Sequence, residues 1–384
     1  MPRVHDRVQL VLAAAGIAAI FFASFLNFAP NRLARSAAHG LLEAPSLQKW
    51  AVIGALAALF SLSLMKQQRT RSAVACIAAG VLSWGILAAA GSLAFTLTAA
   101  GPPAARASPG AAFWTLGAVA VFAIASAMQT AHLGLLARSV IGLFFCAAAV
   151  IMAAAGSFDQ LSLVREFANI SGVFLKELLR HVSLVGAAAL LALLISVPLT
   201  LVVLRGQTLA NAVLASLAIL QTVPSIALFG VLIAPLSRLG EHFPFFPRIG
   251  ISGTGAAPAI IALILYSLLP LVRSFHAGLS GVAPDVKEAA AALGFNRRQI
   301  LLKIEVPLAL PALLSGLRVA TVQAIGLATV AALIGAGGLG TFIFQGIGQY
   351  ALDLVLLGAF PVILLALIAN FAFELLLRLA PEFA

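Results

Sequence analysis

The chain consists of long apolar runs separated by short polar breaks. A bilayer core about 30 Å thick needs roughly 20 helical residues to cross it. Of all residues, 62% are hydrophobic and 9% are charged, against about a quarter charged in a soluble domain. The pattern predicts an all-α integral membrane protein with about ten transmembrane helices, over residues 8–29, 50–65, 73–99, 111–131, 138–156, 181–204, 208–234, 256–279, 312–335 and 351–379.

The same composition excludes other classes of protein. A chain this apolar does not remain disordered. Its net charge of +11 comes from basic residues placed singly or in small groups between apolar runs, which is typical of membrane-interface anchors and not of nucleic-acid binding. Cys76 and Cys146 lie inside apolar runs, so both are expected to be ordinary small core residues. The sequence holds no H-E-x-x-H, C-x-x-C or G-x-S-x-G motif, so it predicts no metal site, catalytic residue or bound cofactor.

The distribution of Lys and Arg indicates the orientation of the spans. With the N-terminus in the cytoplasm, 14 of these residues fall on the inner side and 9 on the outer side. Inner loops carry the excess of basic residues in membrane proteins, so we expect ten spans with both termini inside. The first run has about 22 apolar residues, longer than a signal-peptide core, and is therefore expected to remain as a span.

A change in composition near residues 157–180 divides the chain. This stretch mixes charged residues with Leu and Phe at helical spacing, which predicts an amphipathic helix at the membrane interface leading into the next span. We expect a five-helix membrane region over 1–157 and a second domain over 158–384. The first region shows almost no buried polar residue and no motif, and the sequence assigns it no role.

The longest polar interruption between spans covers residues 283–307. Asp285, just after Pro284, is expected to cap a helix, with Glu288 completing a capping box. The alanines that follow are strong helix formers. Gly294 is expected to end this helix in a left-handed conformation.

Asn296 and Gln299 repeat the capping signal for a second short helix, which Pro307 is expected to stop. The loop is thus predicted as a short helix, a glycine turn and a second short helix. It either merely connects two spans or presents a docking helix to a cytoplasmic partner.

The spacing within this loop resembles the EAA loop of permeases in binding-protein-dependent ABC importers. The family pattern is EAA, three residues, Gly, nine residues, then Ile-any-Leu-Pro, and only Val306, in place of Leu, departs from it. In that family the loop forms a coupling helix in a groove of the ATPase subunit. The resemblance implies coupling roles for Glu288, Ala289, Ala290, Gly294, Ile304 and Pro307, within a coupling loop over 284–307.

Two further segments resemble the glycine betaine, choline and proline branch of this family. They are Gln-Thr-Val-Pro-Ser-Ile-Ala at 221–227 and Leu-Ile-Gly-Ala-Gly-Gly-Leu-Gly at 333–340; the second also occurs in methionine-type permeases. The resemblance covers about 175–380 and implies a five-helix type I ABC importer permease core. Residues 1–157 fall outside that core and resemble extra amino-terminal helices.

The resemblance also implies the partners and location of the chain. Cytoplasmic ABC ATPase subunits would hydrolyse ATP, because no P-loop occurs in this sequence. A periplasmic or extracellular solute-binding protein, a second permease copy or paralogue, and membrane lipid are the other expected partners. The location implied is the bacterial cytoplasmic membrane, and the cargo is a compatible solute such as glycine betaine or choline, or another amino-acid-like solute such as methionine.

Polar residues within spans tend to face a cavity or one another. Gln221, Pro224, Ser225 and Gln323 are therefore candidates to line a transport pathway, and Arg318 accompanies Gln323 in the ninth span. A broken helix with freed carbonyls forms such sites in transporters. The alternative role for these side chains is hydrogen bonding between helices.

Two other classes of function fit the sequence less well. An ion-coupled secondary transporter predicts acidic residues within spans, and only Asp353 and Glu374 qualify, both near span ends. An intramembrane enzyme predicts a cluster of acids, His or a nucleophile at one depth, which the sequence lacks. Gly335, Gly337 and Gly340 fit a dinucleotide-binding pattern formally, but apolar spans flank them; a turn with close helix approach is expected there.

Overall fold

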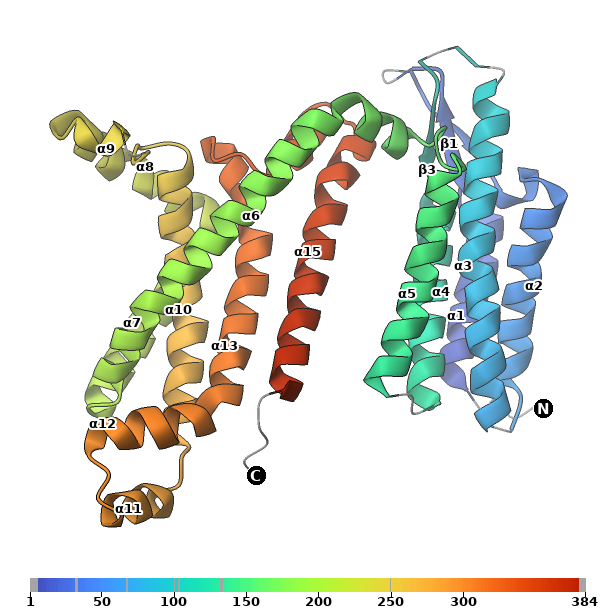
Figure 1. Ribbon diagram of the computed structural model, residues 1–384. Helices are drawn as coiled ribbons and strands as arrows, with labels where there is room; N and C mark the ends of the chain where they lie inside the picture. The colour runs from blue at the N-terminus through green and yellow to red at the C-terminus, as the bar shows by residue number, and fades with distance from the viewer. Residues whose placement is uncertain are drawn as a thin grey trace. The chain divides into compact units, whose positions relative to one another are not determined.

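The computed structural model describes residues 6–31, 34–66, 68–99, 101–102, 104–131, 134–248 and 250–379. Two compact units, Met1–Asn169 and Ile170–Ala384, make up the chain, and each has its own core (Figure 1). Their boundary falls inside α6 (Ser162–Val203), where Ile170 has non-helical φ and ψ angles of −123° and 18°. The stretch over 157–180, predicted to lead into the next span, is helical from Ser162, and after the kink at Ile170 the helix continues past 180 to Val203.

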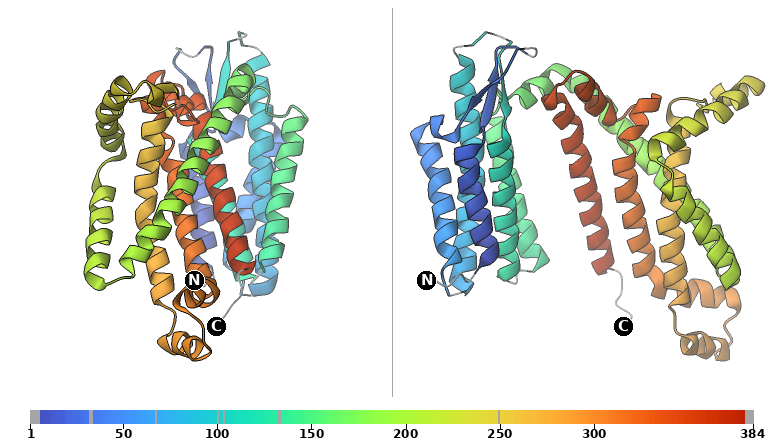
Figure 2. Two further views of the ribbon diagram at one scale, coloured as in Figure 1. Left: turned by 60° about the vertical axis from the view of Figure 1, so that its left-hand side comes forward. Right: turned by 180° about the vertical axis from the view of Figure 1, so that it is seen from behind.

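The first unit is a bundle whose helices lie side by side (Figure 2). Small side chains let these helices approach closely, and Ala13, Ala79, Ala89 and Ala123 are fully buried between them. α3 packs against α2 and α4, and α1 packs against the same two helices. The elements are α1 (Arg7–Phe22), η1 (Leu41–Glu43), α2 (Ser46–Ser63), α3 (Gln68–Ala99), α4 (Ala111–Thr130) and α5 (Leu135–Ala154).

A small antiparallel sheet caps one end of this bundle, which the sequence analysis did not predict. Its strands β1 (Leu26–Ala29), β2 (Ala37–His39) and β3 (Arg106–Pro109) lie in the order β2-β1-β3. Leu26 faces His39 on one side and Pro109 on the other. Beside the sheet, a hydrogen bond with His39 lowers the pKa of the Glu43 carboxyl group.

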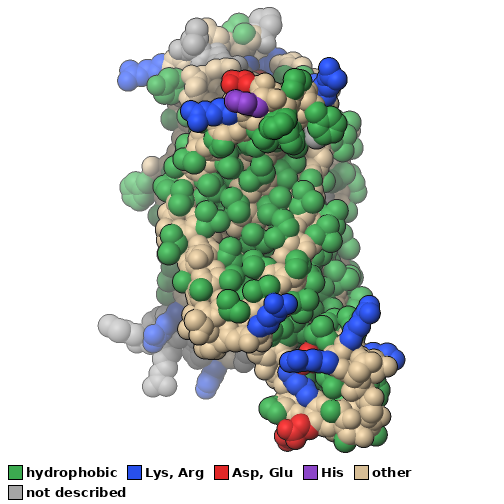
Figure 3. Space-filling model, turned by 90° about the vertical axis from the view of Figure 1, so that its left-hand side faces the viewer, with side chains coloured by type: hydrophobic (Ala, Val, Ile, Leu, Met, Phe, Trp, Pro, Cys, Tyr) green, Lys and Arg blue, Asp and Glu red, His purple; other side chains and the backbone are tan. Residues whose placement is uncertain are grey.

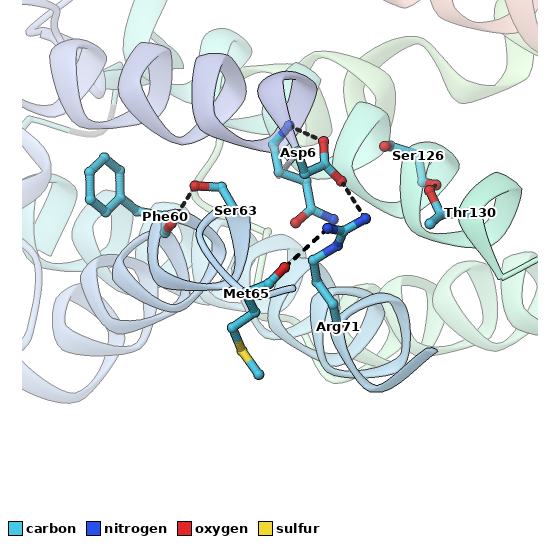
Figure 4. Close-up of polar contacts among 8 residues, drawn as sticks. Asp6, Phe60, Ser63, Met65, Arg71, Ser126 and Thr130 are labelled. Atoms are coloured by element: carbon cyan, nitrogen blue, oxygen red, sulfur yellow. Dashed lines mark hydrogen bonds and ion pairs between the residues drawn. The ribbon is translucent and has the colours of Figure 1, made fainter. Parts of the chain in front are cut away.

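A polar cluster lies at the opposite end of the bundle (Figure 4). The Asp6 carboxylate accepts a hydrogen bond from the backbone N–H of Gln9 and so caps α1. Arg71 is buried; it donates to the Met65 carbonyl at 3.2 Å and lies 3.7 Å from Asp6. The expectation that this region buries almost no polar side chain is therefore wrong, because a charge at a helix end can be paired locally.

The second unit is a set of long helices with one projecting lobe (Figure 1). The core lies between α6, α7, α10, α13 and α15. Its elements after α6 are α7 (Gln207–Thr222), α8 (Ser225–His242), α9 (Phe245–Arg248), α10 (Ala256–Ser280), α11 (Pro284–Ala292), α12 (Arg297–Ile300), the π-helical turn η2 (Leu301–Glu305), α13 (Val306–Leu327), η3 (Val330–Ile334), α14 (Gly340–Gly348) and α15 (Leu352–Leu379).

Helices α10 and α13 form the closest pair in this unit. A Cβ atom added to Gly278 would lie 2.8 Å from the Ala312 Cβ, and one added to Gly316 would lie 2.6 Å from the Ser274 Cβ. Glycines therefore set the separation of the two helices, as small residues do where membrane helices cross. This contact fixes α13, and with it the lobe that precedes α13.

The all-α membrane class is confirmed, and the count of about ten spans is roughly matched. Seven described helices are long and apolar enough to cross a membrane, and the bent pair α7–α8 would make eight. α1 and Val140–Ala154 are shorter apolar helices. Two predicted limits are wrong: the first run stops being helical at Phe22, because the residues that follow join the sheet, and the ninth ends at Leu327 instead of 335.

We expect Gly316→Val to destabilise the second unit. The added Cβ would lie 2.6 Å from the Ser274 Cβ and 3.3 Å from the Pro270 carbonyl oxygen, and valine adds two methyl groups beyond it. Overpacking of this kind costs about 1–3 kcal/mol. Thermal aggregation in detergent measures the loss. Gly326→Val on the same helix is the matched control, because nothing lies within 4 Å of its Cβ position; equal melting of the two variants would contradict this packing.

Candidate functional site

The projecting lobe begins with α11, which lies beyond the ends of α10 and α13 (Figure 1). Pro284 occupies the first turn of α11, and Ala283 is the capping position, with no side-chain cap. The prediction that Asp285 caps this helix is therefore wrong. Pro284 has the φ angle that a first helical residue needs, and the helix therefore starts two residues earlier, with its cap at 283 instead of 285. Asp285 instead lies within the first turn, where its negative charge interacts favourably with the positive end of the helix dipole.

The C-terminal end of α11 is closed by a Schellman motif. Gly294 has φ of +84°, so its left-handed conformation is confirmed. Its N–H donates to the Ala291 carbonyl at 2.9 Å, and the N–H of Phe295 donates to the Ala290 carbonyl at 3.2 Å. These two bonds satisfy carbonyls that the helix end leaves unpaired.

The second helix of the lobe starts at the predicted capping box. Asn296 accepts from the N–H of Gln299 at 2.9 Å, and the Gln299 side chain accepts from the N–H of Asn296 at 2.8 Å. Pro307 does not stop this helix, contrary to the prediction. The chain passes through the π-helical turn of η2 directly into α13. A π-turn changes the hydrogen-bonding register, and it lets a proline follow without ending the helix.

Charged side chains brace α11 against the elements behind it. The Lys287 ammonium lies 2.8 Å from the Glu305 carboxylate of the π-turn and donates to the Leu279 carbonyl of α10 at 3.4 Å. Lys303 lies over the Phe295 ring at 5.9 Å, a distance at which a cation interacts with an aromatic face. The lobe is therefore joined to α10 and α13 at both of its ends.

The predicted coupling residues lie on two sides of the lobe. Glu288 and Ala289 are exposed on α11, next to the exposed Leu293, whereas Ala290 is buried on the inner face of the same helix. Gly294 is exposed at the turn. Ile304 and Pro307 are half-buried in the continuous helix that follows, so they support the lobe from behind.

The predicted seventh span is broken at Pro224. Helices α7 and α8 meet there at an angle of 100°, and both Val223 and Pro224 are extended. The Gln221 side chain donates to the Tyr266 carbonyl of α10 at 2.8 Å, and the Tyr266 hydroxyl donates to the Val223 carbonyl. Pro270 has no N–H to offer the Tyr266 carbonyl four residues earlier, so Gln221 takes the place of that bond.

The other predicted pathway residues do not form one cluster with Gln221. Ser225 is half-buried in the first turn of α8. Gln323 is half-buried on α13, and no described residue hydrogen-bonds to its side chain. Five residues separate Gln323 from Arg318, which places the two about 140° apart around the helix.

A set of contacts that the sequence analysis missed links α6 to the glycine-rich turn. Glu177 accepts from the Gly338 N–H at 2.5 Å, and Arg180 donates to the Ala336 carbonyl at 3.0 Å. His181 is fully buried, with Nε2 3.1 Å from the Ile325 carbonyl. Gly338 has φ of +89°, and a Cβ there would lie 3.2 Å from His181 Nδ1. The charged residues at helical spacing near 176–181 could have indicated these contacts, but the sequence analysis placed them at the membrane interface.

No group of three or more His, Cys, Asp or Glu side chains that could hold a metal occurs within the described ranges. The geometry instead offers two mechanical features: a braced helix that projects from the spans, and a broken span tied to its neighbour.

Comparisons with known proteins divide the chain in two. Residues 6–164 match the family described as the N-terminal domain of the ABC transporter permease YehY. Residues 188–380 match the family described as the inner membrane component of binding-protein-dependent transport systems.

Curated relatives match about half of this chain and most of their own length. The osmoprotectant import permease protein OsmW of Salmonella typhimurium is 39% identical over 50% of this chain and 84% of its own. The carnitine transport permease protein OpuCB of Listeria monocytogenes is 37% identical over 53% and 86%. The choline transport system permease protein OpuBB of Bacillus subtilis is 33% identical over 52% and 85%.

Among solved structures, an inward-facing form of the MetNI methionine ABC transporter is 20% identical. The match covers 56% of this chain and 99% of that chain, with a TM-score of 0.49.

We expect Gln221→Leu to destabilise the broken span. Leucine leaves the Tyr266 carbonyl without a donor, and a buried unsatisfied group costs about 1–3 kcal/mol. The melting temperature in detergent, measured with Gln221→Leu and with the control Gln207→Leu on the same helix, checks this. Gln207 is exposed, and among the residues that the structure describes it bonds only Asn211, so an equal or larger loss in the Gln207 variant would contradict the role of Gln221.

Proposed function

The chain belongs to the family of inner membrane components of binding-protein-dependent transport systems, and we propose that it is the membrane subunit of an ATP-driven importer of a compatible solute. Glycine betaine, choline and carnitine are the solutes we propose. The support is that several relatives at 30% identity or more carry names of permeases for these quaternary ammonium solutes. Each of these matches covers about half of this chain, and the permease family match lies at residues 188–380, so the proposal concerns that part of the chain.

The braced helix α11 carries the mechanical part of the proposal. We propose that its exposed face, with Glu288, Ala289 and Gly294, docks on a cytoplasmic ABC ATPase. The sequence contains no P-loop, so ATP hydrolysis belongs to that partner. Ala290 packs α11 inward, and Ile304 and Pro307 support it from the helix that continues into α13.

A rigid connection is what a coupling element needs. Closure of the ATPases moves the spans only if the docked helix does not bend away from them. The Schellman motif and the Lys287–Glu305 ion pair resist such bending, because they join α11 to the elements that follow it. This brace is the single observation that supports the coupling role most directly.

The broken span is the proposed location of the transport pathway. Pro224 and Ser225 lie at the break, Gln221 holds it against α10, and Gln323 presents a free amide from α13. Interrupted helices give transporters backbone groups that can face a solute. A polar amide within a span has a high cost unless it meets water, a partner or a substrate.

The remaining parts of the proposal concern assembly. We propose a permease domain over 158–384 that pairs with a second copy or a paralogue in the bacterial cytoplasmic membrane. A separate solute-binding protein delivers the cargo on the outer side. Residues 1–157 form the additional membrane region.

We expect Gly294→Val to abolish solute uptake, because a β-branched residue is strained at a φ of +84° and the end of α11 must then reshape. Gly294→Asn is the matched variant, since asparagine tolerates the left-handed conformation. Uptake of radiolabelled glycine betaine into proteoliposomes with the ATPase and binding protein measures both. The Val variant should insert and remain monodisperse.

Uptake by the Val variant at the level of the Asn variant would contradict the coupling role. Uptake of radiolabelled methionine by the unsubstituted chain, with no uptake of betaine, choline or carnitine, would contradict the solute class while leaving the coupling role intact.

A further inference from the structure

A basic cavity of about 990 Å³ lies behind the lobe, at the end of the second unit that carries α11. Its polar lining comes from Arg205 after α6, Lys287 of α11, and Arg297 and Arg298 of α12. One carboxylate, Glu305, also lines it, and that group is paired with Lys287. The lining of the cavity therefore has three more basic than acidic side chains.

The three arginines have no acidic partner among the described residues. Like charges gathered in one cavity repel one another, and a partly apolar lining strengthens that repulsion. Figure 3 shows Lys and Arg side chains gathered where the apolar surface meets the projecting lobe. An anion bound among them would lower this electrostatic free energy.

Apart from Ser280, the rest of the lining is aliphatic: Ile300 and Leu301 belong to the lobe, and three leucines belong to membrane helices. Leu201, Leu204 and Leu279 come from the ends of α6 and α10. Along α6 an exposed apolar stripe leads to this wall, with side chains 40–59% exposed at Leu190, Leu194, Val197 and Leu201. The stripe has helical periodicity, and Arg205 follows it by one turn.

We infer that this cavity binds the headgroup of an anionic phospholipid. The headgroup phosphate would lie among Arg205, Arg297 and Arg298, and one acyl chain would lie along the stripe on α6. Basic pockets at the ends of membrane helices recognise such headgroups. A soluble anion would leave the apolar stripe without a function, whereas a phospholipid matches both the charge and the stripe.

The position of the site connects it to the proposed coupling element. Lys287 belongs to α11, and Arg297 and Arg298 belong to the helix that continues into α13. A bound headgroup would join α6 to both parts of the lobe. The inference depends on the membrane location of the chain, and it does not depend on which solute is carried.

Native mass spectrometry of the full chain in detergent tests the inference, with phosphatidylglycerol and phosphatidylcholine as probes. The variant Arg205→Gln/Arg298→Gln should bind phosphatidylglycerol about thirtyfold more weakly, since each basic residue near a membrane surface contributes roughly fivefold. Phosphatidylcholine binding should not change.

The matched control is Arg238→Gln/Arg248→Gln, which removes two exposed arginines from α8 and α9 at the other end of the unit (Figure 1). It should bind phosphatidylglycerol as the unsubstituted chain does. Equal weakening in the two double variants, or equal binding of the two lipids, would overturn the inference.

Two further arms separate other occupants. Inorganic phosphate at millimolar concentration should not displace phosphatidylglycerol; displacement would assign the cavity to a soluble anion instead. Leu201→Asn should weaken phosphatidylglycerol binding while leaving the protein monodisperse. Loss of dimer mass on Arg205→Gln/Arg298→Gln substitution, with unchanged lipid binding, would assign the cavity to a contact with a second copy.

Discussion

The need to pair every backbone polar group within an apolar environment governs the second unit. Hydrocarbon offers no hydrogen bonds, so an interruption in a membrane helix requires a substitute partner. Pro270 removes a donor from the Tyr266 carbonyl, and the Gln221 side chain replaces it. The Tyr266 hydroxyl in turn donates a hydrogen bond to the Val223 carbonyl at the break between α7 and α8. At the bend, the Tyr266 and Val223 carbonyls thus each have a partner on a neighbouring helix.

The same requirement explains how α6 holds the turn after α13. Glycines with positive φ at this turn leave backbone N–H and carbonyl groups outside any helix. Glu177 pairs with the Gly338 N–H and Arg180 with the Ala336 carbonyl, and the buried His181 contacts the Ile325 carbonyl in the last turn of α13. Outside the apolar layer, at the lobe, capping bonds and ion pairs have the same effect. A helix of nine residues is marginal in isolation, and the bonds at both ends of α11 compensate for its short length.

Much of the fold and of the lobe could be predicted from the sequence where neighbouring residues determine the local structure. Apolar length predicts the membrane class, Gly294 predicts its own left-handed turn, and Asn296 with Gln299 predicts the capping box. The sequence-based predictions were wrong where the structure depends on more than the local residue pattern. Pro307 reads as a helix stop, yet a π-turn carries the helix through it. The short strands of the first unit depend on partners as far away as Arg106–Pro109, and no local pattern records such pairing. Glu177 and His181 contact residues more than 140 positions away in the sequence. Because such distant partners cannot be read from the local sequence, the charged stretch around them was predicted to lie at the membrane interface.

The central claim is that α11 projects into the cytoplasm and transmits motion from a separate ATPase to the spans. Cross-linking tests it directly, with Ala289→Cys as the single cysteine in a chain carrying Cys76→Ala and Cys146→Ala, co-expressed with the ATPase in inverted membrane vesicles. With benzophenone maleimide attached at position 289, we expect illumination to give a covalent adduct with the ATPase, and the yield of this adduct to change when ATP is added. Labelling of position 289 by an impermeant maleimide added to intact cells, with no ATPase adduct in vesicles, would contradict it.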